Sequence, residues 1–190
     1  PRRLVFARDV FEAKASLGNP NISTTKVVVV RREDVLAWDN GFPKFEDCRA
    51  QHVVVASLVG GRPGEEDRVL FFSHRWQDAG NNQADSPDNV QYAVLKQYLV
   101  SPDGQRITHV WVDLSCINQD RGTKEGLQEF LMRLDNIGTA ICCAAVVLVV
   151  PRLHRMEGTT AEGVYYSDLW EYTGRGWCIF ESAMARLMGC

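Results

Sequence analysis

Three separate stretches of the 190-residue chain carry side chains that could do chemistry on a polar ligand. The stretch "SHRW" supplies a hydroxyl, a guanidinium and an indole, "DLSCINQD" supplies carboxylates and amides, and "RGWCIFE" supplies an indole and a carboxylate. Such groups converging on one crevice are the usual makeup of a polar ligand site. The candidate site residues are Ser73, Arg75, Trp76, Asp113, Asn118, Trp177 and Glu181.

Glu181 stands out because it lies where a helix should be packing. If residues 175–188 form one helix, five apolar residues repeat with the spacing of a single buried stripe, and Glu181 falls inside it. A carboxylate in that position is either a structural ion-pair partner, for which Arg75 is the candidate, or a group that faces a ligand. The predicted stripe consists of Trp177, Phe180, Met184, Leu187 and Met188.

Simpler structural roles are open to several candidates. Ser73 and Asp113 could cap the segments that follow them, which is as well supported as a ligand contact. Trp76 and Trp177 are favoured as core residues over a shelf for a ring-shaped ligand.

Other kinds of site find less support. The four histidines are scattered without metal-ligand spacing, so no metal is expected. A thiol nucleophile at Cys116 or Cys178, with His74 as base and Asp113 as its orienting group, is conceivable but no spacing demands it. A G-x-x-x-x-G-K loop is absent, and "GGRPG" (60–64) precedes a strand where a dinucleotide fingerprint must follow one. No resident cofactor is expected.

The elements that position these residues follow from apolar patterning. Strands are predicted at 68–73, 109–115 and 145–150, and helices at 86–99 and 127–141. Ser86 is the predicted cap of the first helix, with Pro87 at its first position. Strands alternating with helices predict an α/β fold with a parallel sheet covered on both faces. Ligands of such sheets bind at the carboxyl ends of the strands, where "SHRW" and "DLSCINQD" lie.

The N-terminal third is less regular. "KVVVV" (26–30) and "HVVVASLV" (52–59) predict two more strands, which would extend the sheet at one edge. The predicted organisation is therefore an N-terminal extension over residues 1–66 and an α/β domain over residues 67–190.

Composition narrows the class of partner. A formal charge of −3 without a local basic patch argues against nucleic acid. The longest uncharged run, 137–150, falls short of the roughly 20 residues that span a bilayer. Six cysteines without a C-x-x-C pair predict buried thiols in a reducing, cytoplasmic setting. Because the first residue is not Met, further domains of a longer protein are expected as partners.

Three motifs resemble those of a known superfamily. "RGWCIFESA" resembles the WC-x-x-E helix of Toll/interleukin-receptor (TIR) domains, and "LFFSHRW" resembles their first strand and the loop after it. "HVWVDLSCINQD" is similar to the WIDxLCINQ segment of fungal heterokaryon-incompatibility (HET) domains, a related group. Arg175, Trp177 and Glu181 match the R-x-W-x-x-x-E element of that group. The resemblance covers residues 68–188, with the motifs in the family's order.

The resemblance implies a flavodoxin-like fold and, as in many TIR relatives, cleavage of NAD+ at the nicotinamide–ribose bond. By motif position Glu181 is the implied catalytic carboxylate. Such domains often work as self-associated assemblies in immune or cell-death signalling, while others are non-catalytic adaptors. A full TIR domain continues past this helix with more strands, so the strands at 26–30 and 52–59 would replace the missing edge.

A mechanism can be written on this basis. Nicotinamide leaves as a neutral group, so the barrier lies in the oxocarbenium-like ribose, whose positive charge one carboxylate can stabilise. Glu181 is assigned to the ribose, Arg75 and Ser73 to the diphosphate or ribose rim, and Trp76 or Trp177 to stacking on nicotinamide. Asp113 and Asn118 are assigned, more loosely, to contacts of the substrate loop. The same carboxylate chemistry fits the N-ribosyl bond of another nucleotide or nucleoside.

Overall fold

The computed structural model describes residues 27–55, 68–78, 83–155 and 165–188 of the chain. Helices, short 3-10 turns (η) and strands alternate throughout these ranges. In chain order they are β1 (Val27–Arg31), α2 (Arg32–Ala37), η1 (Arg49–Gln51), β2 (His52–Val55), β3 (Val69–His74), α3 (Val90–Val100), η2 (Gly104–Arg106), β4 (His109–Val112), α4 (Asp113–Cys116), α5 (Lys124–Asp135), α6 (Ile137–Cys143), β5 (Ala144–Val150), β6 (Leu153–Arg155), β7 (Tyr165–Ser167), α7 (Leu169–Thr173) and α8 (Gly176–Met188).

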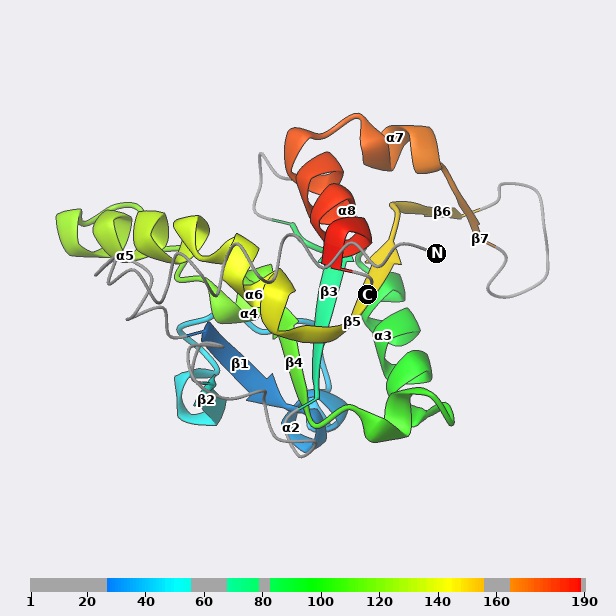
Figure 1. The fold of residues 1–190 in the computed structure, drawn as a ribbon, viewed down its shortest axis with the longest axis horizontal. Helices are drawn as coiled ribbons and strands as arrows, with labels where there is room; N and C mark the ends of the chain where they lie inside the picture. Colours follow the sequence, from blue (N-terminus) through cyan, green and yellow to red (C-terminus); the bar gives the residue numbers. More distant parts are fainter. Residues whose placement is uncertain (1–26, 56–67, 79–82, 156–164, 189–190) are drawn as a thin grey trace.

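A five-stranded sheet in the order β2-β1-β4-β3-β5 lies at the centre of the fold (Figure 1). Strand β3 pairs in parallel with both β4 and β5, whereas β1 pairs antiparallel with β4 and with β2. The predicted α/β class is confirmed, and the strands found near 26–30 and 52–59 form one edge of this sheet. Residues 56–59, the end of the second predicted strand, lie outside the described ranges. Strands β6 and β7 form a separate hairpin.

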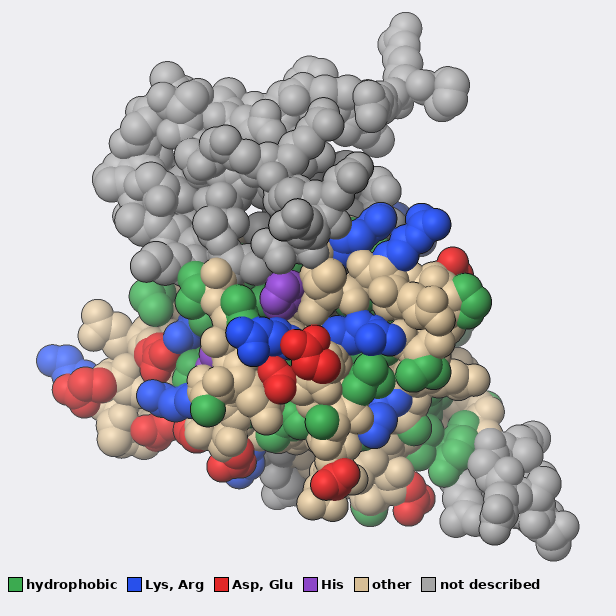
Figure 2. All heavy atoms as spheres, turned by 90° about the horizontal axis from the view of Figure 1, so that it is seen from below, with side chains coloured by type: hydrophobic (Ala, Val, Ile, Leu, Met, Phe, Trp, Pro, Cys, Tyr) green, Lys and Arg blue, Asp and Glu red, His purple; other side chains and the backbone are tan. Residues whose placement is uncertain are grey.

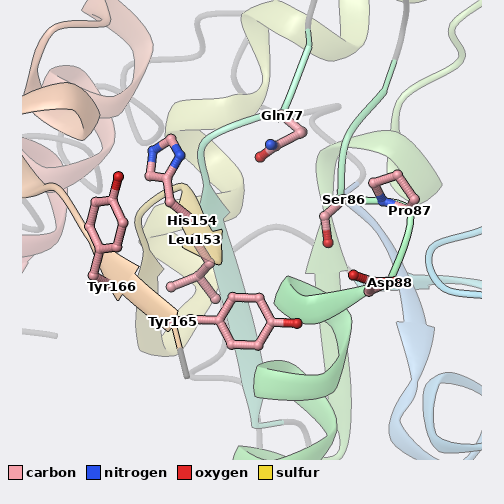
Figure 3. A pocket seen from close by; sticks show the side chains of 8 residues that line it. All are labelled: Gln77, Ser86, Pro87, Asp88, Leu153, His154, Tyr165 and Tyr166. Atoms are coloured by element: carbon pink, nitrogen blue, oxygen red, sulfur yellow. The ribbon is translucent and has the colours of Figure 1, made fainter. Parts of the chain in front are cut away.

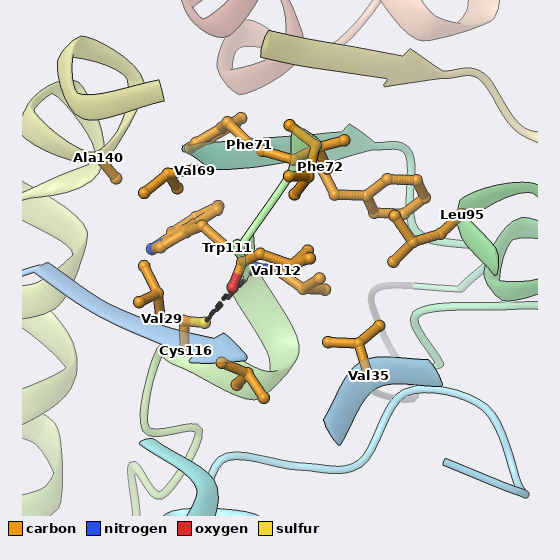
Figure 4. Packing of buried hydrophobic residues seen from close by; sticks show 14 of the residues in the cluster. Val29, Val35, Val69, Phe71, Phe72, Leu95, Trp111, Val112, Cys116 and Ala140 are labelled. Carbon is orange, nitrogen blue, oxygen red and sulfur yellow. Dashed lines mark hydrogen bonds between the residues drawn. The ribbon is translucent and has the colours of Figure 1, made fainter. Parts of the chain in front are cut away.

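Side chains of β3 alternate between two covered faces of the sheet (Figure 4). Phe71 stacks on Trp111 with ring centroids 4.3 Å apart, on the side of Ala140 in α6. Phe72 points the opposite way, toward Leu95 of α3. Helices α6 and α8 contact β3, and α2 contacts α3. Burial on both faces explains why this strand is apolar from Val69 to Phe72 instead of alternating.

Helix α3 begins later than predicted. It starts at Val90 and follows Asn89, whose backbone is in the left-handed conformation, and the N–H groups of its first turn bond mainly to Asp85. The Asp85 carboxylate accepts hydrogen bonds from the backbone N–H of Gln91 at 3.0 Å and of Tyr92 at 2.7 Å. The Ser86 hydroxyl accepts only a longer bond, 3.3 Å, from Val90. A charged acceptor makes the stronger bond to a helix N-terminus.

The helix predicted at 127–141 is in fact two helices. Helix α5 begins earlier, because the Thr123 hydroxyl accepts the backbone N–H of Gly126 at 3.0 Å. The chain then leaves the helical conformation at Asn136 before α6 begins. Apolar spacing continued across Asn136, so periodicity alone did not detect the break.

The strand predicted at 109–115 ends at Val112. The next four residues form the single turn α4, which begins with Asp113. The carboxylate of Asp113 accepts the backbone N–H of Leu114 at 2.6 Å. This local bond competes with continued strand pairing and turns Asp113 toward the loop region at the carboxyl edge of the sheet.

The buried face of α8 differs from the predicted stripe. Trp177 and Phe180 are 46% and 39% exposed, whereas Cys178, Glu181 and Ala185 are buried. Helical periodicity gives the spacing of a buried face but not its centre, and the small side chains of Cys178 and Ala185 allow close packing on α6 and β3. The side chains of the last two members of the predicted stripe, Leu187 and Met188, lie outside the described part.

Charged side chains of both signs are interspersed over the described part of the face in Figure 2. No basic patch suited to a phosphate backbone is visible on that face. None of the helices in the described ranges is long and apolar enough to cross a membrane. Cys48, Cys116 and Cys178 are free and buried, as expected for thiols in the core.

Candidate functional site

A cavity of about 300 Å³ lies at the carboxyl ends of β3 and β4, where the following loops meet the start of α8. It brings together residues from all three of the candidate stretches "SHRW", "DLSCINQD" and "RGWCIFE". Four of the seven candidates line it, namely Trp76, Asp113, Trp177 and Glu181. The other lining residues are His74, Ile117, Gln119, Arg121, Phe130, Leu134, Ile137, Arg175 and Cys178.

Glu181 is 9% exposed and lines the cavity without an ion-pair partner among the described residues. Its Oε2 atom accepts a hydrogen bond from the hydroxyl of Ser73. Burial raises the pKa of Glu181 to about 7. The Ser73 hydrogen bond and the charge of Arg175 act to lower this pKa, whereas the charge of Asp113 acts to raise it. A carboxylate with this pKa is partly ionised at neutral pH and is poorly compensated by the protein.

A chain of buried hydroxyls holds Glu181. The Tyr172 hydroxyl is hydrogen-bonded to the Ser73 hydroxyl, which donates its proton to Glu181. A serine has one proton to donate, so Tyr172 donates to Ser73 whenever Ser73 donates to the carboxylate. Burial raises the pKa of Tyr172 to about 12, which keeps it protonated and able to donate. Tyr172 was not predicted, because no motif or spacing linked it to Ser73.

Arg75 lies elsewhere. Its guanidinium is 3.5 Å from Oε1 of Glu171 and donates to the backbone carbonyl of the same residue. Glu171 also pairs with Arg152 and His154, each at 2.9 Å, and the His154 hydrogen bond is the largest influence lowering the pKa of Glu171. The alternative that Arg75 is the structural partner of Glu181 is therefore wrong, since the Arg75 guanidinium pairs with Glu171 on α7. Arg75 does not line the cavity.

Trp76 and Asp113 form a pair at the cavity wall. The indole Nε1 of Trp76 donates to Oδ2 of Asp113 at 2.6 Å. This bond fixes the Trp76 ring between the ends of β3 and β4. Trp177 comes from α8 and meets the ring of Phe180 edge-on, with centroids 6.0 Å apart. Two indoles from different elements thus border one cavity that also contains a carboxylate.

His74, considered from the sequence only as the base for a thiol nucleophile, also lines the cavity. It is buried between the rings of Phe42 and Phe72, with centroids 5.4 and 5.0 Å away. Neither ring nitrogen has a hydrogen-bond partner among the described residues, although Nε2 lies 3.9 Å from Oδ1 of Asp113. Buried nitrogens without partners are uncommon, and here they belong to a residue that lines the cavity.

Asn118 has a structural position. Its side-chain Nδ2 donates to Oε2 of Glu129 at 2.7 Å, and its side-chain Oδ1 accepts a hydrogen bond from the backbone N–H of Asp120 at 2.9 Å. Asn118 is buried and does not line the cavity. It anchors the loop that follows it, and two residues of that loop, Gln119 and Arg121, line the cavity.

The cavity has no activated thiol. Burial raises the pKa of Cys178 to about 11, and it also raises that of Cys116. A thiol with a raised pKa is protonated at neutral pH and is a poor nucleophile. Among the described residues no three His, Cys, Asp or Glu side chains gather where they could hold a metal ion.

A second cavity, of about 510 Å³, lies between the β6-β7 hairpin and the segment before α3 (Figure 3). Tyr165 points across it toward Asp88, and the ring of Tyr166 stacks on His154 at 5.2 Å. Asp88 is exposed, so this larger cavity lacks a desolvated carboxylate among its lining residues.

Searches of the chain against protein-family models, curated proteins and solved structures return no match.

Proposed function

We propose that the protein is a TIR-like NAD+ glycohydrolase that cleaves the nicotinamide–ribose bond with Glu181. The observation that carries the proposal is the state of this carboxylate: it is buried, it has no ion-pair partner among the described residues, and it borders a cavity. A protein that only needed stability would gain little from this arrangement, because an uncompensated buried charge is costly.

The order of the strands supports a flavodoxin-like fold as part of the proposal. The first strand of the parallel part, β3, lies between the second, β4, and the third, β5. The chain therefore leaves β3 toward one side and later returns on the other, which creates a switch point at the carboxyl ends. Ligands of doubly wound sheets bind at such points.

The mechanism uses the negative charge of Glu181. As the C1′–N bond breaks, its electron pair goes to the nicotinamide nitrogen, which becomes neutral, and positive charge develops on the ribose. An ionised Glu181 stabilises that charge in a site where little water screens it. Water then adds to C1′ and loses a proton to the solvent. Ser73 and Tyr172 orient the carboxylate through one oxygen and leave the other without a hydrogen bond among the described residues.

The indoles define where the nicotinamide ring would lie. Trp177 is partly exposed at the cavity and is free to stack on a planar cation. Trp76 is fixed by Asp113 and forms a rigid wall on another side. Asp113 acts through Trp76 and adds negative charge near a cationic ring. NAD+ is the substrate in this proposal, and no further cofactor is required.

The experiment is a nicotinamide-release assay on purified protein over a range of protein concentrations, because TIR-like enzymes often act as assemblies. Wild type should release nicotinamide from NAD+, and Glu181→Gln should not, while its circular dichroism remains native. Turnover by Glu181→Gln at the wild-type rate would end the catalytic proposal. The proposal includes a cytoplasmic role in immune or cell-death signalling, for which the motif resemblance is the support.

A non-catalytic adaptor that self-associates is the second candidate, favoured by exposed apolar residues on α7 and α8. Leu169 and Trp170 are 63% and 86% exposed, and Ile179 is also exposed. An adaptor would show concentration-dependent mass in light scattering, which Trp170→Ser abolishes, and would release no nicotinamide at any concentration.

A further inference from the structure

Two arginines line the cavity without a carboxylate partner among the described residues, Arg121 and Arg175. Other arginines of this region are paired: Arg75 and Arg152 with Glu171, and Arg133 with Glu129 at 2.7 Å. Paired guanidiniums stabilise the fold, whereas guanidiniums at a cavity without an acid are available to a ligand.

The two side chains occupy different depths. The Arg121 guanidinium lies over the ring of Phe130, 4.1 Å from its centroid, on an exposed loop residue. Stacking holds the plane of the guanidinium and leaves its N–H edges free to donate. Arg175 is partly buried just before α8, near enough to Glu181 to lower its pKa.

The size of the cavity shows which part of a ligand it can enclose. At about 300 Å³ it is at the lower end of the range for small-molecule sites. It can hold a ring and a ribose, but the remainder of a dinucleotide must extend over the rim. Arg121 is exposed at that rim, so a group attached to the ribose would pass it.

From these observations we infer that Arg121 and Arg175 form an anion subsite that binds the diphosphate of a dinucleotide. The inference rests on the proposed function and extends it, because it makes the substrate a phosphorylated nucleotide instead of a nucleoside. It also transfers the diphosphate contact from Arg75, which is held by Glu171, to two arginines that bind nothing else among the described charges. Planar guanidiniums bind phosphate oxygens through paired N–H donors.

The kinetic test compares two substrates that share the scissile bond. Arg121→Gln and Arg175→Gln should each lower kcat/KM for NAD+ by about tenfold or more, the value of a lost charged hydrogen bond. At about pH 9, where Glu181 stays ionised in both variants, neither variant should lower kcat/KM for nicotinamide riboside, which has no phosphate, by more than about twofold. Arg106→Gln is the matched control, since Arg106 is exposed on η2 at the amino end of β4.

A binding test separates this inference from the catalytic proposal. In calorimetry, wild type and Arg106→Gln should bind ADP-ribose alike, and each cavity variant should bind it about tenfold or more weakly. Adenosine, which lacks phosphate, should show no difference among the four proteins. Binding of ADP-ribose without any NAD+ cleavage would refute the catalytic proposal and leave the subsite intact.

Two results would overturn the subsite. One is an equal loss of kcat/KM for NAD+ and nicotinamide riboside, which would mean that the arginines only adjust the charge of Glu181. The other is wild-type affinity for ADP-ribose in both cavity variants.

Discussion

Replacing Glu181 with glutamine should stabilise the fold while abolishing activity. Glutamine has nearly the same shape, and its carbonyl can still accept the Ser73 hydrogen bond. What it lacks is the charge, which burial makes unfavourable. Most substitutions of buried polar groups destabilise a protein, so a gain in stability would be a specific signature of an uncompensated carboxylate.

The magnitude follows from the shift in pKa. The pKa of Glu181 rises from its ordinary value of 4.5 to about 7 in the folded protein. At about 1.4 kcal/mol for each tenfold change in proton affinity, this corresponds to about 3 kcal/mol. The folded state holds the proton more tightly than the unfolded state, so wild type loses this stability as the pH rises from 4.5 through 7. Above that range the full penalty is present, and below pH 4.5 it is absent.

Urea unfolding followed by tryptophan fluorescence at pH 5 and pH 8 measures the effect. Glu181→Gln should exceed wild type by about 3 kcal/mol at pH 8 and by less than about 1 kcal/mol at pH 5. Glu129→Gln is a matched control of opposite sign: hydrogen bonds from Arg133 and Asn118 lower the pKa of Glu129 despite its partial burial, so this variant should lose stability at pH 8. If Glu181→Gln instead loses several kcal/mol at both pH values, the carboxylate has a structural partner and the reasoning fails.

Three other outcomes are expected. Activity of wild type should rise with pH through about 7 as Glu181 ionises. Because the Ser73 hydrogen bond lowers the pKa of Glu181, its loss in Ser73→Ala should raise that pKa and move the rise to higher pH in a pH–rate profile. An unmoved profile would contradict the hydroxyl chain. Trp177→Ala should raise KM for NAD+ by roughly tenfold through lost stacking, while Trp170→Ala, outside the cavity, should leave the KM unchanged. Glu171→Gln should weaken the ion pairs with Arg75 and Arg152 and the hydrogen bond with His154, and lower the melting temperature by at least roughly 2–4 °C, which calorimetry would detect.

The central strand β3 was predictable because burial on both faces leaves an uninterrupted apolar run from Val69 to Phe72. The edge strand β5 is also apolar, although most of its residues are only partly buried. Helix boundaries were less predictable, because they depend on which side-chain acceptor forms hydrogen bonds with the first backbone N–H groups of the helix. At α3 the carboxylate of Asp85 takes bonds that Ser86 was expected to take. Such competition is decided by the path of the chain and not by residue type alone.

The candidate site was predictable at the level of strand ends and much less so for individual contacts. Parallel strands place the residues that follow them at one edge, which brought Trp76 and Asp113 to the cavity, and helix α8 adds Glu181 to it. Arg75 follows the same strand but turns toward Glu171. Residue type could not distinguish these outcomes, because an arginine pairs with whichever carboxylate the tertiary fold brings nearest.

The hydrogen bond between Ser73 and Glu181 joins residues 108 positions apart. The geometry of the candidate site therefore exists only after α8 has docked on β3, whatever state the rest of the sheet has reached. Thermal release or proteolytic removal of α8 would break this contact and take Trp177, Cys178 and Glu181 away from the cavity. Under the proposed function, chains in which α8 has not docked would therefore be unable to consume NAD+.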